Sequence, residues 1–178
     1  MVHLIQGLGS FDDVLARARA KVAVIALIAT IYATITVILG SLSYSWIQVR
    51  ISEALTPLPF LMGFPAVAGL TLGCVLANCF SPAGLPDMIF GPLLTLLAGV
   101  FSWKLNFGKK AVACIYPVLV NAFGVSAYIS SFYQVPYLLS VVTIAVGEFI
   151  AVVFVGYPLL TTIEKTVVGL RKKENPKN

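Results

Sequence analysis

The chain alternates between long apolar runs and short polar breaks. A helix needs about 20 mostly apolar residues to cross the hydrocarbon core of a bilayer. The pattern therefore predicts six membrane-spanning helices, at about residues 22–42, 46–63, 65–80, 87–103, 111–132 and 136–162, and a polar tail at 171–178. Because the connections are short, we expect one all-α integral membrane domain, a six-helix bundle without a linker.

The run at 46–63 is ambiguous, because it contains Arg50, Glu53, Pro57 and Pro59. The distribution of Lys and Arg distinguishes six crossings from five. With six crossings, 11 of the 12 basic residues fall on one side of the membrane, whereas five crossings divide them 9 to 3. Cytoplasmic segments carry an excess of Lys and Arg, so the charges favour six spans with both termini in the cytoplasm of a cell-membrane protein.

Composition supports the membrane class. Of the 178 residues, 59% are hydrophobic and 11% are charged, with a mean hydropathy of +0.96. Soluble domains carry about 25% charged residues, and a chain this short has no core large enough to hide so much apolar surface. We therefore expect a lipid bilayer around the protein. The net charge of +5 is interpreted as a topology signal, and no nucleic-acid partner is expected.

The sequence offers little for catalysis or cofactors. Cys74, Cys79 and Cys114 lie in apolar runs, and His3 is the sole histidine, so neither a disulfide framework nor a metal site is expected. There is no G-x-x-x-x-G-K-[ST] motif for ATP, and a Ser-His-Asp set has no suitable histidine. We expect a protein without a cofactor that is not an enzyme.

A few polar side chains fall inside the predicted spans, where they are costly and usually mark functional sites. They are Arg50, Glu53, Asn78, Asp87, Asn121 and Glu148. Glu148 follows Gly147 and lies roughly 18 Å along the last helix, near the membrane midplane. Together these groups predict a cavity that opens outward and suits a planar, donor-rich solute, including a cationic one.

Simpler interpretations compete for most of these residues. Arg50 and Glu53 are three residues apart and can pair with each other. Asp87 can be the N-cap or a first-turn acid of a helix, and Asn121 can satisfy a neighbouring helix. Ligand contact is favoured for Glu148, because no basic residue lies deep in another span. Aromatic residues near the outer side, Tyr128 among them, are interpreted mostly as interface anchors, with one or two able to stack on a planar ring.

Small residues at four-residue spacing mark two packing faces, since they let helix backbones approach closely. Gly69 and Gly73 are interpreted as packing within the bundle. Ala29 and Ala33 either pack in the same way or dock a partner subunit.

Several segments resemble the queuosine-precursor transporter family of the QueT type. They are Ile47–Leu55 (IQVRISEAL), Gly69–Asn78 (GLTLGCVLAN), Gly84–Gly91 (GLPDMIFG) and Leu94–Leu97. The resemblance extends from about Ala26 to Leu160. The Q-x-R-x-S-E-A-L string is its specific part, and Gln48, Arg50, Glu53, Asn78 and Asp87 match the family pattern by position.

The resemblance implies a substrate-binding (S) component of an energy-coupling-factor (ECF) transporter, with six helices and a vitamin-like solute bound from outside. Its implied partners are a transmembrane coupling protein, docked at Ala29 and Ala33, and two ATP-binding subunits. The implied cargo is a deazaguanine precursor of queuosine, such as the aminomethyl or cyano form. Glu148 or Glu53 would read its guanine-like edge and Asp87 would face its side arm, while Arg50 would hold Glu53 or contact the carbonyl.

Other classes remain open. A self-contained secondary transporter would use Glu148 as a proton- or ion-coupling group. A membrane enzyme would use the carboxylates as acid and base, and a structural subunit would bind no solute.

Overall fold

The computed structural model describes residues 11–43 and 49–174, and over these residues the chain is helical with no strand. The elements follow in the order α2 (Phe11–Ile38), α3 (Gly40–Ser43), η1 (Ile51–Leu55), α4 (Pro59–Met62), α5 (Phe64–Asn78), α6 (Gly84–Lys104), α7 (Lys110–Tyr133), α8 (Tyr137–Phe149), η2 (Ile150–Gly156) and α9 (Tyr157–Glu174). The prediction of an all-α fold is confirmed. Gln48, which matches the family pattern, lies outside the described residues.

Four helical stretches in the described part are long and apolar enough to cross a membrane: Leu15–Ile38, Gly84–Lys104, Lys110–Tyr133 and Tyr137–Gly169. Helix α5 is apolar but has only 15 residues, which gives a length of about 22 Å. The last stretch passes from α8 through the π-helical turn η2 into α9 without a break. Helix α9 continues to Glu174 and so includes the start of the predicted polar tail.

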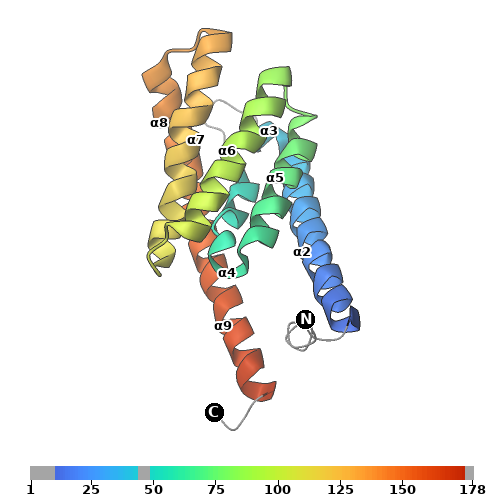
Figure 1. Cartoon of the computed structure of the whole chain (residues 1–178). Coiled ribbons are helices and arrows are strands. Elements are labelled where there is room, and N and C mark those ends of the chain that lie inside the picture. Colours follow the sequence, from blue (N-terminus) through green and yellow to red (C-terminus); the bar gives the residue numbers. More distant parts are fainter. Residues whose placement is uncertain (1–10, 44–48, 175–178) are drawn as a thin grey trace, which may run out of the picture.

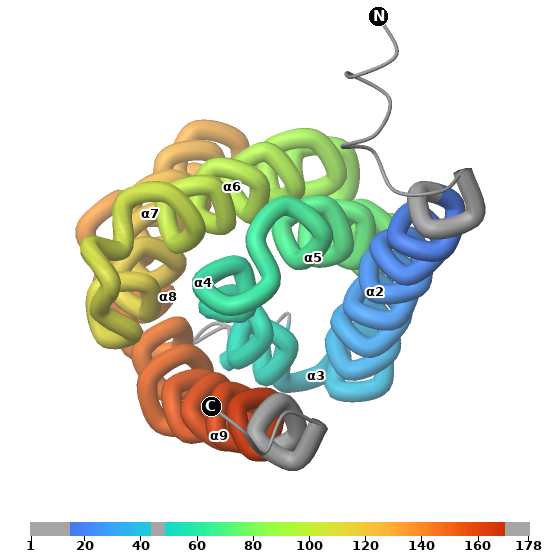
Figure 2. Tube along the Cα trace, turned by 60° about the horizontal axis from the view of Figure 1, so that its bottom comes forward, coloured from blue at the N-terminus to red at the C-terminus, as the bar shows by residue number. Residues whose placement is uncertain are grey.

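The long elements form a ring, seen end-on in Figure 2, that runs in the order α2, α5, α6, α7, α8 and α9. The short elements η1 and α4 lie inside this ring. The beginning of α2 and the end of α9 lie at the same end of the bundle (Figure 1). The core includes Tyr32, Leu70, Cys74 and Leu160, which are at most 1% exposed.

The predicted second span differs from the structure. Its described part, residues 49–63, forms an extended stretch at Arg50 and then η1 and α4, rather than one helix. Pro57 and Pro59 have no backbone N–H to donate to a helix, and Gly63, at φ 61°, ends α4. Irregular backbone at membrane depth is tolerated where protein surrounds it. Here Ser52 is fully buried and Thr56 is 1% exposed.

The contact between α2 and α5, which we call the α2–α5 seam, depends on small residues. A Cβ atom on Gly69 would lie 2.9 Å from the backbone oxygen of Ile25, and one on Gly73 would lie 2.9 Å from that of Ala29. The interpretation of these glycines as packing residues is confirmed. Ala29 lies in the seam and is 5% exposed, whereas Ala33 is half-buried.

Basic residues gather at one end of the bundle. This end holds the first turns of α2, the end of α6, the start of α7 and much of α9 (Figure 1). The basic residues on these segments include Arg17, Arg19, Lys21, Lys104, Lys109, Lys110 and Lys165. Lys110 Nζ also pairs with Glu164 Oε2 at 2.6 Å and joins α7 to α9.

Candidate functional site

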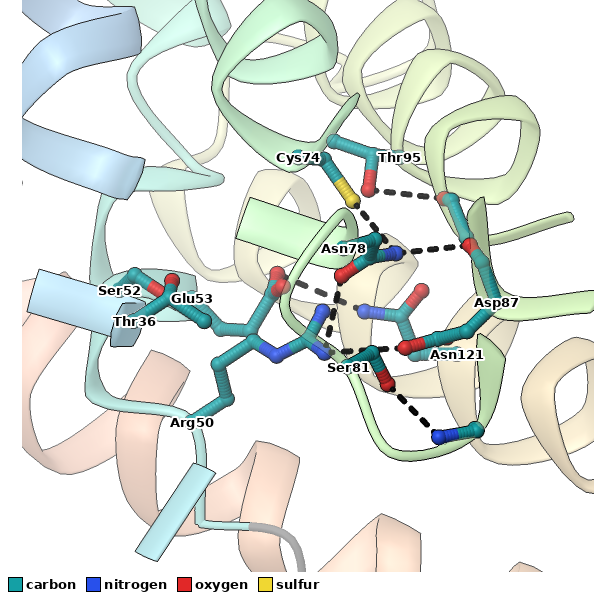
Figure 3. Close-up of polar contacts among 12 residues, drawn as sticks. Thr36, Arg50, Ser52, Glu53, Cys74, Asn78, Ser81, Asp87, Thr95 and Asn121 are labelled. Carbon is teal, nitrogen blue, oxygen red and sulfur yellow. Dashed lines mark hydrogen bonds and ion pairs between the residues drawn. The ribbon is translucent and has the colours of Figure 1, made fainter. Parts of the chain in front are cut away.

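The six polar residues singled out in the sequence converge in the interior of the ring. Arg50 precedes η1, Glu53 lies in it, and Asn78, Asp87, Asn121 and Glu148 come from α5, α6, α7 and α8. Figure 3 labels the first five of these six residues. Apart from Arg50, all are buried, with exposed fractions from 0% to 6%. A small cavity lies between them. Its lining is Arg50, Glu53, Asp87, Gly91, Thr95, Asn121, Val125, Tyr128, Ile144 and Glu148.

Asn78 supports the site without lining this cavity. Its side-chain oxygen accepts a hydrogen bond from Arg50 Nη2 at 3.2 Å, and its Nδ2 donates to the backbone oxygen of Asp87 at 2.8 Å. A Cβ atom on Gly91 would lie only 2.3 Å from Asn78 Nδ2. The glycine that ends the GLPDMIFG string therefore makes room for the asparagine.

Asp87 lies in the first turn of α6, but the N-cap is Ala83 and no side chain caps this helix, so the interpretation of Asp87 as a cap is wrong. Its carboxyl group is part of the site. Its Oδ2 lies 3.7 Å from Arg50 Nη2 in an ion pair, and its Oδ1 accepts a hydrogen bond from the Tyr128 hydroxyl. Tyr128 is 6% exposed and stacks on Phe90, with ring centroids 5.6 Å apart. The interpretation as an interface anchor is wrong for Tyr128, which belongs to the cavity wall.

The second half of the site joins two carboxyl groups through one amide. Asn121 Nδ2 donates to Glu148 Oε1 at 2.9 Å and lies 3.4 Å from Glu53 Oε2. The other Glu53 oxygen accepts a hydrogen bond from the Tyr32 hydroxyl. Glu148 Oε2 is buried and has no hydrogen-bond partner among the described residues. Asn121 thus makes the expected interhelical contacts while it also lines the cavity.

Sequence reasoning missed the polar groups that α2 contributes. Tyr32 and Thr36 are fully buried. Thr36 Oγ1 lies 2.6 Å from Ser52 Oγ, next to Glu53 in the chain. Tyr32 and Thr36 are four residues apart, so they share one face of the helix. This polar pair inside an apolar run was the available signal.

Comparison with known proteins identifies the family. Residues 22–165 match the family described as QueT transporter. The chain belongs to the QueT transporter family. It is 28% identical over 156 residues to the queuosine precursor transporter QueT of Lactococcus lactis subsp. cremoris (strain MG1363), which covers 80% of this chain and 91% of that protein. No solved structure matches this chain.

The charge balance of the cavity in this QueT-family chain is uneven. Three carboxyl groups and one guanidinium group line it. Burying a charge without a partner is costly, so the cavity gains from a proton, a cation or a solute rich in donors. In the described part of the chain, no group of three His, Cys, Asp or Glu side chains is placed to hold a metal ion.

The cavity of this family member is narrow. Its free volume is about 20 Å³, which is close to the space that one water molecule needs. A bicyclic base is much larger than a water molecule. Binding such a solute here requires the side chains of the wall to move apart.

Proposed function

We propose that the chain is the membrane-embedded substrate-binding component of an ECF-type importer and captures a queuosine-precursor base from outside. The observation that carries this proposal is the buried polar cavity with a carboxylate oxygen, at Glu148, that has no partner in the described part of the chain. The protein's membership of the QueT transporter family and its relative, named a queuosine precursor transporter, support it.

The proposed topology has six crossings with both termini in the cytoplasm. The beginning of α2 and the end of α9 lie at one end of the bundle (Figure 1), as an even number of crossings requires. In this topology residues 49–63 belong to the second crossing, in irregular form. The end that carries the basic residues faces the cytoplasm, and Asp87, at the start of α6, lies toward the outside.

The chemistry of a deazaguanine fits the groups of this cavity. Its guanine-like edge presents a ring N–H and an exocyclic amine, which can donate two parallel hydrogen bonds to one carboxylate. The aminomethyl form adds a cation, which offsets the excess of carboxyl groups, whereas the cyano form does not. In this arrangement Glu148 or Glu53 reads the edge beside Asn121, and the side arm faces Asp87. Arg50 holds Glu53 in place or contacts the ring carbonyl.

In this proposal ATP is used by partner subunits, through a transmembrane coupling protein that docks on α2. Ala33 is the central contact, because it is partly exposed while Ala29 is covered by α5. Ala33→Trp should abolish uptake by the complete transporter and leave solute binding intact. Val142→Trp, on a 60% exposed position of α8, is the matched control. Normal uptake by Ala33→Trp would exclude this face as the dock.

The main test is equilibrium binding to the detergent-purified chain without ATP or partners. The ligands are the aminomethyl- and cyano-deazaguanines, queuine and guanine. Tight binding of one deazaguanine in preference to guanine supports the proposal. Absence of binding by well-folded protein contradicts it. Uptake by the chain alone in proteoliposomes would favour a secondary transporter instead.

A further inference from the structure

The three carboxyl groups of the cavity differ in how many donors they already have. Both oxygens of Asp87 have partners, in Tyr128 and Arg50. Both oxygens of Glu53 also have partners, in Tyr32 and Asn121. In Glu148, Oε1 accepts from Asn121, but Oε2 has no partner among the residues that the structure describes. Among the carboxyl groups of this cavity, an oxygen is left for a ligand only on Glu148.

This unpartnered oxygen needs a physical explanation. Glu148 is 6% exposed and lines the cavity. Buried polar atoms in proteins nearly always have a hydrogen-bond partner, and leaving a charged acceptor without one costs more than leaving a neutral one. A donor that enters the cavity would provide the missing hydrogen bond.

The surroundings of Glu53 indicate a different role. Its carboxyl group is 2% exposed and lies between a tyrosine of α2 and an amide of α7. By accepting from Asn121, Glu53 helps to orient the same Nδ2 group that binds Glu148 Oε1. Its hydrogen bonds fix the position of the amide and, through it, of Glu148.

We propose that Glu148 is the residue that reads the donor edge of the solute and that Glu53, held by Tyr32, is a positioning residue. This inference rests on the proposed function and deepens it. The preferred solutes are bases with an exocyclic amine beside a ring N–H, because that pair of donors matches a carboxylate with a free oxygen. The same ring without the amine loses one of the two hydrogen bonds.

The test compares two ligands on four purified full-length proteins. The ligands are aminomethyl-deazaguanine and an analogue that lacks the amine attached directly to the guanine-like ring edge but keeps the aminomethyl arm. The proteins are the wild type, Glu148→Gln, Glu53→Gln and Tyr32→Phe. The wild type should prefer the amine-bearing ligand by about tenfold or more, as expected for one hydrogen bond to a charged acceptor.

The variants should separate reading from positioning. Glu148→Gln should reduce the preference to less than about threefold, because an amide has one acceptor oxygen where the carboxylate has two. Glu53→Gln and Tyr32→Phe should weaken both ligands by the same factor and keep the preference. A full preference in Glu148→Gln, or its loss in Glu53→Gln, would overturn the inference.

Glu148→Asp and the wild-type protein distinguish failure of this inference from a folding defect and from failure of the proposed function. If Glu148→Gln does not fold, Glu148→Asp keeps the charge but withdraws it by one methylene, and it should still lower the preference. An unchanged preference in Glu148→Asp would then overturn the inference. If the wild type binds neither ligand, the proposed function itself fails. If it binds with a preference that Glu148 does not control, only the assignment of the reader fails.

Discussion

The α2–α5 seam holds its helices together in a different way from the polar cluster around the cavity. We use the name polar cluster for Arg50, Glu53, Asn78, Asp87, Asn121 and Glu148. In a membrane no hydrophobic force drives one apolar helix against another, so helices associate through close packing and hydrogen bonds. The seam relies on close packing, because Gly69 and Gly73 bring α5 against the backbone of α2. The cluster relies on hydrogen bonds between side chains from several elements.

The difference shows where the molecule can change. The seam has no room for an added Cβ atom without a shift of the Ala29 backbone. The cluster, in contrast, has a water-sized cavity and, at Glu148, an acceptor that no described residue pairs with. We infer that the seam provides the rigid frame and that the cluster contains the groups that rearrange around a solute. Tyr32 and Thr36 connect the two, because they lie on α2 and contact Glu53 and Ser52.

The largest effect is expected from Arg50, the cation that lines the described part of the cavity. Arg50→Met leaves the buried Asp87 carboxylate without its ion-pair partner, which should cost about 3–5 kcal/mol of stability and abolish solute binding. Thermal unfolding in detergent and calorimetry measure the two effects. Arg50→Lys keeps the positive charge and should lose less stability and less solute affinity than Arg50→Met. Wild-type stability in Arg50→Met would show that the cluster does not need its cation.

A substitution in the seam should separate stability from recognition. Gly73→Val forces α2 and α5 apart, and overpacking of this kind costs about 1–3 kcal/mol. The protein should unfold at a lower temperature, while its preference between the two ligands stays unchanged. Leu72→Val, at a 51% exposed position of the same helix, is the control. A changed ligand preference in Gly73→Val would contradict the division into frame and binding groups.

A milder variant tests the connection between the two regions. Thr36→Val keeps the shape of the side chain but removes the hydroxyl group that contacts Ser52. The loss of this buried hydrogen bond should cost about 1 kcal/mol and weaken both ligands equally, since the segment that carries Arg50 and Glu53 is held less firmly. Ligand affinities equal to those of the wild type would show that α2 does not position this segment.

The smallest effect is expected far from both regions. Lys110→Ala removes the ion pair with Glu164 at the basic end of the bundle. Pairs that water can reach contribute little, so unfolding temperature and solute affinity should both remain within error of the wild type. The double variant with Glu164→Ala is the control. A clear loss of affinity would reveal coupling between this end and the cavity.

Much of the candidate site could be predicted from the sequence. A polar side chain inside an apolar run is costly to expose to lipid, so it faces the interior of the bundle. Arg50, Glu53, Asp87, Asn121 and Glu148 all line one cavity. Asn78 lies behind them, where it contacts Arg50 and the backbone of α6. Tyr32 and Tyr128 were harder to assign, since an aromatic residue in a membrane protein is more often an anchor or a packing residue.

The sequence by itself determined an all-helical membrane protein with a polar interior, because hydropathy and the cost of buried charge depend on local composition. Only the tertiary structure decided that residues 49–63 fold into short elements inside the ring, where neighbouring helices shield their irregular backbone. It also decided which carboxyl group is left with an open acceptor. That depends on the donors brought to each oxygen by Tyr32, Tyr128, Arg50 and Asn121, and these donors lie on elements far apart in the chain.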